Sequence, residues 1–329
     1  MYRKLGETNL RISVICLGPM RWVAKGSGDK DKAKAGPSDA EHPQDAKHEL
    51  ALRRALDAGV NFLHSSYEYG TRWIMGRVLK DHPKRGELHH IIKVPVPDFK
   101  DQDHFDPAKF RLRVEEALSD LYAERISLLQ WMWRSEPNTD ERRLPLLQNI
   151  LEEVVATFEK MRDEGKVGYL MTFPYTVPCA RAALETGKFS GLIAYYNLVE
   201  MEMADLFDDL EERQMGFVAI RPLYQGILTD ERKEQASLSA TDRFADEKFV
   251  RDFAKRKQIV QTFREEIGAS MTRFAIRFVL ASPVVASVVV GLNTPEQVDG
   301  VVSAVEGELP ALQTVRKAQE LWRSDFTLA

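Results

Sequence analysis

The stretch GVNFLHSSYEYG, from Gly59 to Gly70, changes from apolar to polar within a few residues. It begins with β-branched and aromatic side chains, as a buried strand does, and ends in a Tyr-Gly pair, which is typical of a loop. Parallel barrels build their functional sites where strands end and such loops begin. The stretch therefore predicts a barrel strand whose tip, with His64 close to it, lies at a functional site.

Further short apolar runs resemble this strand and alternate with longer segments that carry apolar residues at helical spacing. The runs are 12–18, 89–96, 125–133, 167–173, 191–197, 216–223 and 286–292. The helical segments include 45–59, 109–123, 150–165, 179–187 and 202–214. This alternation predicts an α/β fold, the (β/α)8 or TIM barrel, with its active site at the carboxyl ends of the strands.

The opening residues MYRKLGETNLRIS contain two short strand-like runs around a Glu-Thr-Asn turn. We expect an N-terminal β-hairpin that closes the bottom of the barrel. No shift in composition separates a second unit, so the sequence predicts a single domain over residues 1–329.

Composition limits the partners. Lys and Arg number 46 against 50 Asp and Glu, which gives a formal charge of −4. This balance gives no reason to expect nucleic acid or an anionic membrane as a partner, and it favours a small-molecule substrate. The oligomeric state has no signature in the sequence.

The two cysteines, Cys16 and Cys179, lack a metal-type spacing, which favours a reduced, cytoplasmic protein. The polar N-terminus predicts no signal peptide, and no apolar run is long enough to span a membrane. Strand alternation places His64 and His89 at different heights in the barrel, so we expect no metal site.

Two polar segments interrupt the alternation. Residues 25–48 are rich in Lys, Asp, Gly, Pro and Ala, and residues 224–248 are long and poor in helix-forming pattern. We expect both to be loops, of which the second extends over the mouth of the barrel. Each is either a gate for a ligand or an insertion without a role.

The order of several motifs resembles the aldo-keto reductase superfamily over nearly the whole chain. These motifs are YRKLGETNLRIS, LDAGVNFLHSSYEYG, IIKV, LQWMW, EGKVGYLMTF, YYNL, RPLYQGIL and GLNTPEQ. The resemblance implies a barrel that binds NAD(P)H across its top and reduces a carbonyl group. It also implies a tyrosine, a lysine, an aspartate and a histidine around that carbonyl.

Residue by residue, half of this catalytic set is replaced. Tyr69 and Lys93 stand at the tyrosine and lysine positions, whereas His64 stands at the aspartate position and Met132 at the histidine position. The resemblance implies that Tyr69 transfers a proton and that Lys93 lowers the pKa of its phenol. The thioether of Met132 accepts hydrogen bonds only weakly, so it cannot orient a carbonyl as an imidazole does.

The charge of Lys93 poses a separate question, because position 64 no longer supplies a carboxylate. A nearby ammonium favours phenolate, so Tyr69 beside Lys93 remains a proton-transfer pair. Burial without a carboxylate favours the neutral amine. Two states fit the sequence: a partly neutral Lys93, or a neutral His64 that accepts a hydrogen bond from Lys93.

The positions that the resemblance assigns to the nicotinamide are mostly apolar. They are occupied by Phe173, Pro174, Ile193 and Ile220. None of these side chains can donate to or accept from a carboxamide. The resemblance implies NAD(P) as cofactor, but the sequence predicts that its binding is weak or absent.

The phosphate half of the implied cofactor site retains more polar residues. Arg221 replaces a serine of the family, and GLNTPEQ keeps Gly291 and Gln297 at the start of a helix. Asn293 replaces an arginine that grips a 2′-phosphate, and Val301 replaces an asparagine near the adenine. We expect residual contacts at Arg221 and Gly291, without a preference for NADPH.

Candidate substrate-binding residues lie near the predicted strand ends. Trp22 and Tyr67 could line a pocket for a sugar ring or an aromatic metabolite, and Arg134 could hold an anionic group. If Met132 points inward, Trp131 and Trp133 point outward against helices.

Three functions fit these residues. The first is a divergent oxidoreductase that acts on a carbonyl or hydroxyl group with Tyr69 and Lys93. The second is a lyase or isomerase that uses Tyr69, Lys93 and His64 without nicotinamide, and the third is a catalytically silent barrel protein.

Overall fold

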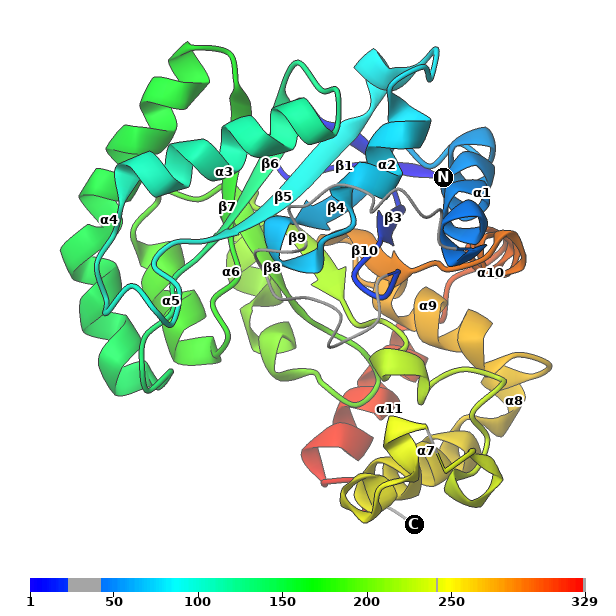
Figure 1. Cartoon of the computed structure of the whole chain (residues 1–329). Coiled ribbons are helices and arrows are strands. Elements are labelled where there is room, and N and C mark those ends of the chain that lie inside the picture. The colour runs from blue at the N-terminus through cyan, green and yellow to red at the C-terminus, as the bar shows by residue number, and fades with distance from the viewer. Residues whose placement is uncertain (23–42, 241, 328–329) are drawn as a thin grey trace.

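The computed structural model describes residues 1–22, 43–240 and 242–327. Eight parallel strands close into a barrel in the order β10-β3-β4-β5-β6-β7-β8-β9, with helices around it (Figure 1). The strands are β3 Ile15–Gly18, β4 Phe62–Ser66, β5 His89–Pro95, β6 Ile126–Met132, β7 Val167–Thr172, β8 Gly191–Tyr195, β9 Gly216–Ile220 and β10 Val285–Gly291. The predicted TIM barrel is confirmed.

Alternation along each strand divides the apolar residues between two cores. The inner core fills the barrel and includes Phe62, Ile91, Leu128, Met171 and Ile193. The larger outer core lies between the strands and the helices and contains the alternate residues, such as Leu63, Ile92 and Leu129. On each strand, residues an even number of positions away from an inner-core residue therefore point into the barrel, and those at the strand end line the mouth.

Strand register places the site residues at neighbouring strand ends. Ser66 pairs with Lys93 between β4 and β5, and Lys93 pairs with Gln130 between β5 and β6. Pro95 pairs with Met132 near the end of β6. The tips of β4, β5 and β6 consequently meet at one side of the mouth.

The helices follow the strands as expected. They are α1 Pro43–Asp57, α2 Arg72–Leu79, α3 Pro107–Asp120, α4 Asp140–Asp163, α5 Val177–Glu185, α6 Phe207–Glu212, α7 Val250–Thr262, α8 Arg264–Ile267, α9 Met271–Ala281, α10 Pro295–Ala304 and α11 Leu312–Arg323. Helix α4 begins ten residues before the predicted start and includes Pro145 in its second turn. Within the described residues, no helix is both long enough and apolar enough to span a membrane.

The N-terminal hairpin consists of β1 Tyr2–Lys4 and β2 Arg11–Ser13, which pair antiparallel. Leu5, Leu10 and Ile12 are buried in the inner core of the barrel. The backbone N–H of Glu7 donates to Gln214 O, just before β9. The hairpin therefore closes the bottom of the barrel, as predicted.

The predicted loop 25–48 lies mostly outside the described residues. Its last part is not a loop, because α1 begins at Pro43. The segment 224–248 contains only short 3₁₀ turns, as predicted: η5 Tyr224–Gly226, η6 Gln235–Ser237, η7 Arg243–Ala245 and η8 Glu247–Phe249. With α7 it forms the lobe at the bottom of Figure 1, and its Gln225 Oε1 lies 3.5 Å from Nη2 of Arg21, just after the tip of β3. That the segment extends over the mouth stays a prediction.

Candidate active site

The turn after β4 carries two of the site residues. The 3₁₀ turn η2, Tyr67–Tyr69, is capped by Ser66, whose Oγ accepts from the backbone N–H of Glu68 at 3.3 Å. Gly70 ends the turn with φ 64°, a left-handed conformation that suits glycine. This turn sends Tyr67 and Tyr69 in different directions.

Tyr69 points toward the strand ends. Its ring centroid lies 5.8 Å from that of His64 on β4 and 5.0 Å from Lys93 Nζ on β5. These three residues are therefore brought together, as the sequence predicted.

Lys93 has a carboxylate partner, which corrects the expectation of a lysine without one. Its Nζ lies 2.5 Å from Oε2 of Glu68, the residue just before Tyr69. The side chains of Lys93 and Glu68 are 14% and 10% exposed. This mostly buried ion pair favours the ammonium form of Lys93 over the neutral amine.

Glu68 also binds Arg134, at the end of β6. Arg134 donates from Nη1 to Oε1 at 2.7 Å and from Nη2 to Oε2 at 3.2 Å. Burial raises the pKa of Glu68, but Lys93 and Arg134 outweigh it and lower the pKa to about 2. Glu68 is thus a carboxylate at neutral pH, shared between two cations.

His64 is neutral, and one of its ring nitrogens is hydrogen-bonded to Gln130. Its Nε2 lies 2.8 Å from Oε1 of Gln130 on β6. Burial lowers the pKa of His64 to about 4, and the charges of Lys93 and Arg72 add to this effect. The hydrogen bond to Gln130 opposes the shift but does not cancel it.

The phenol of Tyr69 is protonated at neutral pH. Burial raises its pKa, and the nearby charge of Glu68 raises it further. The expectation of a lowered phenol pKa is therefore wrong, because burial and the carboxylate dominate. A protonated phenol can donate a proton but is a poor base.

Met132 faces inward and the two tryptophans beside it face outward, as predicted. Met132 is 4% exposed, and its sulfur lies 4.0 Å from Nη2 of Arg134. Trp131 and Trp133 belong to the outer core and donate to Val96 O and Arg143 O. Met132 therefore contributes an apolar contact next to the charged cluster.

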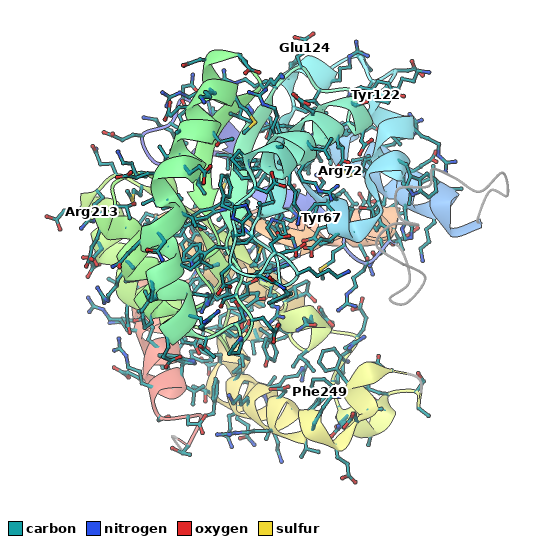
Figure 2. The ribbon with its side chains drawn as sticks, turned by 60° about the vertical axis from the view of Figure 1, so that its left-hand side comes forward. Tyr67, Arg72, Tyr122, Glu124, Arg213 and Phe249 are labelled. Atoms are coloured by element: carbon teal, nitrogen blue, oxygen red, sulfur yellow. The ribbon has the colours of Figure 1, made fainter. Side chains whose placement is uncertain are left out.

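Two of the three candidate substrate residues, Tyr67 and Trp22, make packing contacts. Tyr67, which is labelled in Figure 2, follows the end of β4. The guanidinium of Arg113 from α3 lies 4.1 Å from its ring centroid, and its hydroxyl is 3.5 Å from Asp98. Trp22 is 3% exposed, stacks on His48 and donates to Leu292 O. Both are packing residues in this structure.

Arg134, the third candidate, lies at the site but is already engaged. In addition to Glu68, its Nε donates to the hydroxyl of Tyr175 at 2.9 Å. Its guanidinium lies 4.8 Å from the ring centroid of Phe99, an aromatic residue that is 43% exposed. Its main role is to hold Glu68 rather than to offer a vacant anion site.

Several residues of the site escaped prediction from the sequence. Glu68, Gln130, Tyr175 and Tyr195 were not singled out. Gln130 could have been found from the sequence, because it lies two residues before Met132 on β6 and its side chain therefore points the same way. Tyr175 and Tyr195 each pack edge-on against Phe173, with centroids 4.7 Å and 5.2 Å apart, and form an aromatic side of the mouth.

Among the residues that the structure describes, no group of three or more His, Cys, Asp or Glu could hold a metal ion. The Nδ1 of His89 lies 3.1 Å from Ser127 Oγ. The histidines of the strands thus have roles in packing and hydrogen bonding.

The positions assigned to the nicotinamide ring offer apolar contacts. Ile193 is fully buried in the inner core, and Ile220 packs against that core. Phe173 is 3% exposed, and the backbone oxygen of Pro174 is taken by Arg143. These residues do not fit a carboxamide through hydrogen bonds, although they could border a flat ring.

Arg221 stands at the end of β9 in a left-handed backbone conformation, with φ 61°. Its guanidinium stacks on Tyr195, 3.9 Å from the ring centroid, and Nη1 lies 3.0 Å from Glu200 Oε1. The side chain is 34% exposed, so it can also meet a phosphate.

The turn before α10 contains a polar side-chain atom that could contact a ligand. Thr294 caps the helix, and Gln297 Oε1 accepts from the backbone N–H of Asn293 at 2.9 Å. Oδ1 of Asn293 is buried without a hydrogen-bond partner within the described residues. Together with Gly291 and Arg221, these residues fit the phosphate and ribose half of a dinucleotide.

Comparison with known proteins agrees with this architecture. The sequence profile of the Aldo/keto reductase family matches residues 15–320. An uncharacterized oxidoreductase of Bacillus subtilis, YrpG, is 27% identical over 93% of this chain and 91% of its own length. The L-galactose dehydrogenase of Arabidopsis thaliana is 22% identical over 92% of this chain and 87% of its own length.

The same fold occurs in a solved structure, the holo form of aldo-keto reductase AKR11C1 from Bacillus halodurans. It superimposes with a TM-score of 0.72 and 19% identity, over 97% of this chain and 95% of the other. The family profile covers nearly the whole barrel, from β3 to α11. The chain therefore belongs to the aldo/keto reductase family.

Proposed function

We propose that this protein is an oxidoreductase that reduces a carbonyl group of a small metabolite to a hydroxyl group, with Tyr69 as the proton donor and Lys93 assisting. The observation that carries the proposal is the position of a buried, protonated Tyr69 against the Lys93 ammonium. Proton transfer by a positioned phenol is an effective form of general acid catalysis.

In the reductive direction, the Tyr69 hydroxyl donates its proton to the substrate oxygen. The phenolate that remains lies beside Lys93. Nζ of Lys93 lies 5.0 Å from the ring centroid, so its positive charge attracts the phenolate, whereas the charge of Glu68 opposes it. Lys93 thus stabilises the anion that proton transfer creates.

A bound nicotinamide would supply or accept the hydride. Arg221 and Asn293 are the residues that would hold its phosphate and ribose groups, and Ile193 and Ile220 would border the ring. Because these side chains offer the ring no hydrogen bonds, the aromatic side formed by Phe173, Tyr175 and Tyr195 must orient the substrate against it.

One observation favours the alternative, a lyase or isomerase that works without nicotinamide. Every position assigned to the carboxamide is apolar or has its backbone oxygen occupied. Such an enzyme needs a base, and the raised pKa of Tyr69 makes the phenol unsuitable for that role. We therefore place this alternative second.

The experiment is an activity screen of the purified protein with carbonyl compounds of small metabolite size. The absorbance of NADH or NADPH should fall in the presence of a substrate, and no product should form without the nucleotide. Product formation that needs no nucleotide would favour the lyase or isomerase, and no activity in either direction would favour a silent barrel protein.

A further inference from the structure

The carboxylate of Glu68 contacts both cations of the mouth, Lys93 and Arg134. We propose that Glu68 is the positioning residue of the proton-transfer pair: it fixes the Lys93 ammonium beside Tyr69. This inference rests on the proposed function and adds a residue to it.

The turn itself fixes the carboxylate. Glu68 lies inside η2, and the N–H of Glu68 is held by the Oγ of Ser66 at the end of β4. Because Ser66 pairs with Lys93 across the strands, the start of the turn and the base of the lysine side chain are in register. The carboxylate and the ammonium therefore meet without a long, flexible connection.

Arg134 determines which way the carboxylate faces. Its two Nη atoms donate to the two oxygens of Glu68, a bidentate geometry that fixes the plane of the group. Tyr175 in turn holds Nε of Arg134. In this orientation Oε2 points at Lys93 Nζ, 2.5 Å away.

The positive charges of Lys93 and Arg134 need the carboxylate of Glu68 to balance them. Lys93 and Arg134 are both mostly buried, with side chains 14% and 9% exposed, so without Glu68 two cations would face each other in a space with little water. The neutral form of Lys93 would then be favoured. Glu68 also raises the pKa of the Tyr69 phenol, which keeps the proton that is to be donated.

The first test is the pH profile of turnover in Glu68→Gln, which keeps the shape of the side chain but removes its charge. Loss of the carboxylate makes both Lys93 and Tyr69 easier to deprotonate, so the alkaline limb of the kcat profile should move to lower pH by about one unit, with kcat about tenfold lower. Glu164→Gln is the matched control, because Glu164 pairs with Arg111 in an exposed ion pair. An alkaline limb that stays in place would overturn the proposal.

The second test does not depend on activity and so separates this inference from the proposed function. A pulse of acetic anhydride labels neutral amines, and mass spectrometry reports the labelling of each lysine. In Glu68→Gln, labelling of Lys93 should rise about tenfold at mildly alkaline pH. Lys109 is the internal control, because its partners are Asp98 and Asp101. Unchanged labelling of Lys93 would contradict the proposal whether or not a substrate is found.

Faster labelling of Lys109 in Glu68→Gln would reveal a folding defect in that variant. A second variant, in which the labelling of Lys93 should change in the opposite direction, keeps the proposal testable in that case. Arg134→Gln removes the cation that competes with Lys93 for the carboxylate of Glu68. Labelling of Lys93 should then become severalfold slower than in the wild type. Equal or faster labelling in this variant would show that Glu68 does not govern the charge of Lys93.

Discussion

At the scale of single residues, the mouth of the barrel depends on which groups carry charge. Lys93, Glu68 and Arg134 form a charged cluster, whereas His64 and Tyr69 beside it are kept neutral by burial. Neutral neighbours avoid further repulsion near Lys93. The same burial gives the protein a dependence on pH that can be measured.

The stability of the folded state should fall as the pH falls from about 6.5 to about 4. Burial lowers the pKa of His64 and of His90 to about 4 in the folded protein. The unfolded chain binds these protons at higher pH, so acid favours unfolding by on the order of 3 kcal/mol for each histidine. Urea unfolding at several pH values measures this change.

His64→Gln isolates one of the two histidines. It keeps a polar side chain near Gln130 but binds no proton. The loss of folding stability between pH 6.5 and pH 4 should therefore be smaller than in the wild type by about the contribution of one histidine. An identical pH dependence in wild type and variant would contradict the shifted pKa of His64.

At the scale of elements, a single side chain organises the polar segment after β9. Arg256 on α7 is buried, and its guanidinium donates to the backbone oxygens of Ile227, Thr229 and Lys233. Asp230 in the same segment accepts from Ser270 Oγ and from the N–H of Met271, at the start of α9. These contacts stabilise a segment that has no α-helix of its own.

Arg256→Met should therefore loosen residues 227–233 and destabilise the protein by about 2 kcal/mol or more, because three backbone oxygens lose a buried donor. Limited proteolysis followed by mass spectrometry would locate new cuts in this segment. Arg251→Met is the control, since Arg251 on the same helix is 73% exposed. Equal resistance to protease in both variants would show that Arg256 is not the anchor.

At the scale of the whole molecule, the barrel and its hairpin follow from the sequence because strand and helix periodicity extend over many residues. The same alternation correctly separates Met132 from Trp131 and Trp133. It gives no information within a 3₁₀ turn, where side chains do not alternate. For this reason the direction of Tyr67 could not be predicted and Glu68 was missed, although both lie within the stretch that defines the strand.

The distribution of polar residues along the cofactor site predicts weak nucleotide binding. Two or three hydrogen bonds lost at the carboxamide should weaken binding by roughly two orders of magnitude. With Asn293 near the ribose instead of a cation, NADH and NADPH should bind about equally. Calorimetric titration measures both affinities, and a sub-micromolar affinity for NADPH would show that other side chains hold the ring.

Turnover in Tyr69→Phe is the most direct test of the proposed function, because this change removes only the hydroxyl that transfers the proton. With a substrate from the carbonyl screen, kcat should fall by at least about 10²-fold, while thermal unfolding and nucleotide binding remain close to those of the wild type. Wild-type turnover in the correctly folded variant would contradict a role of Tyr69 in proton transfer.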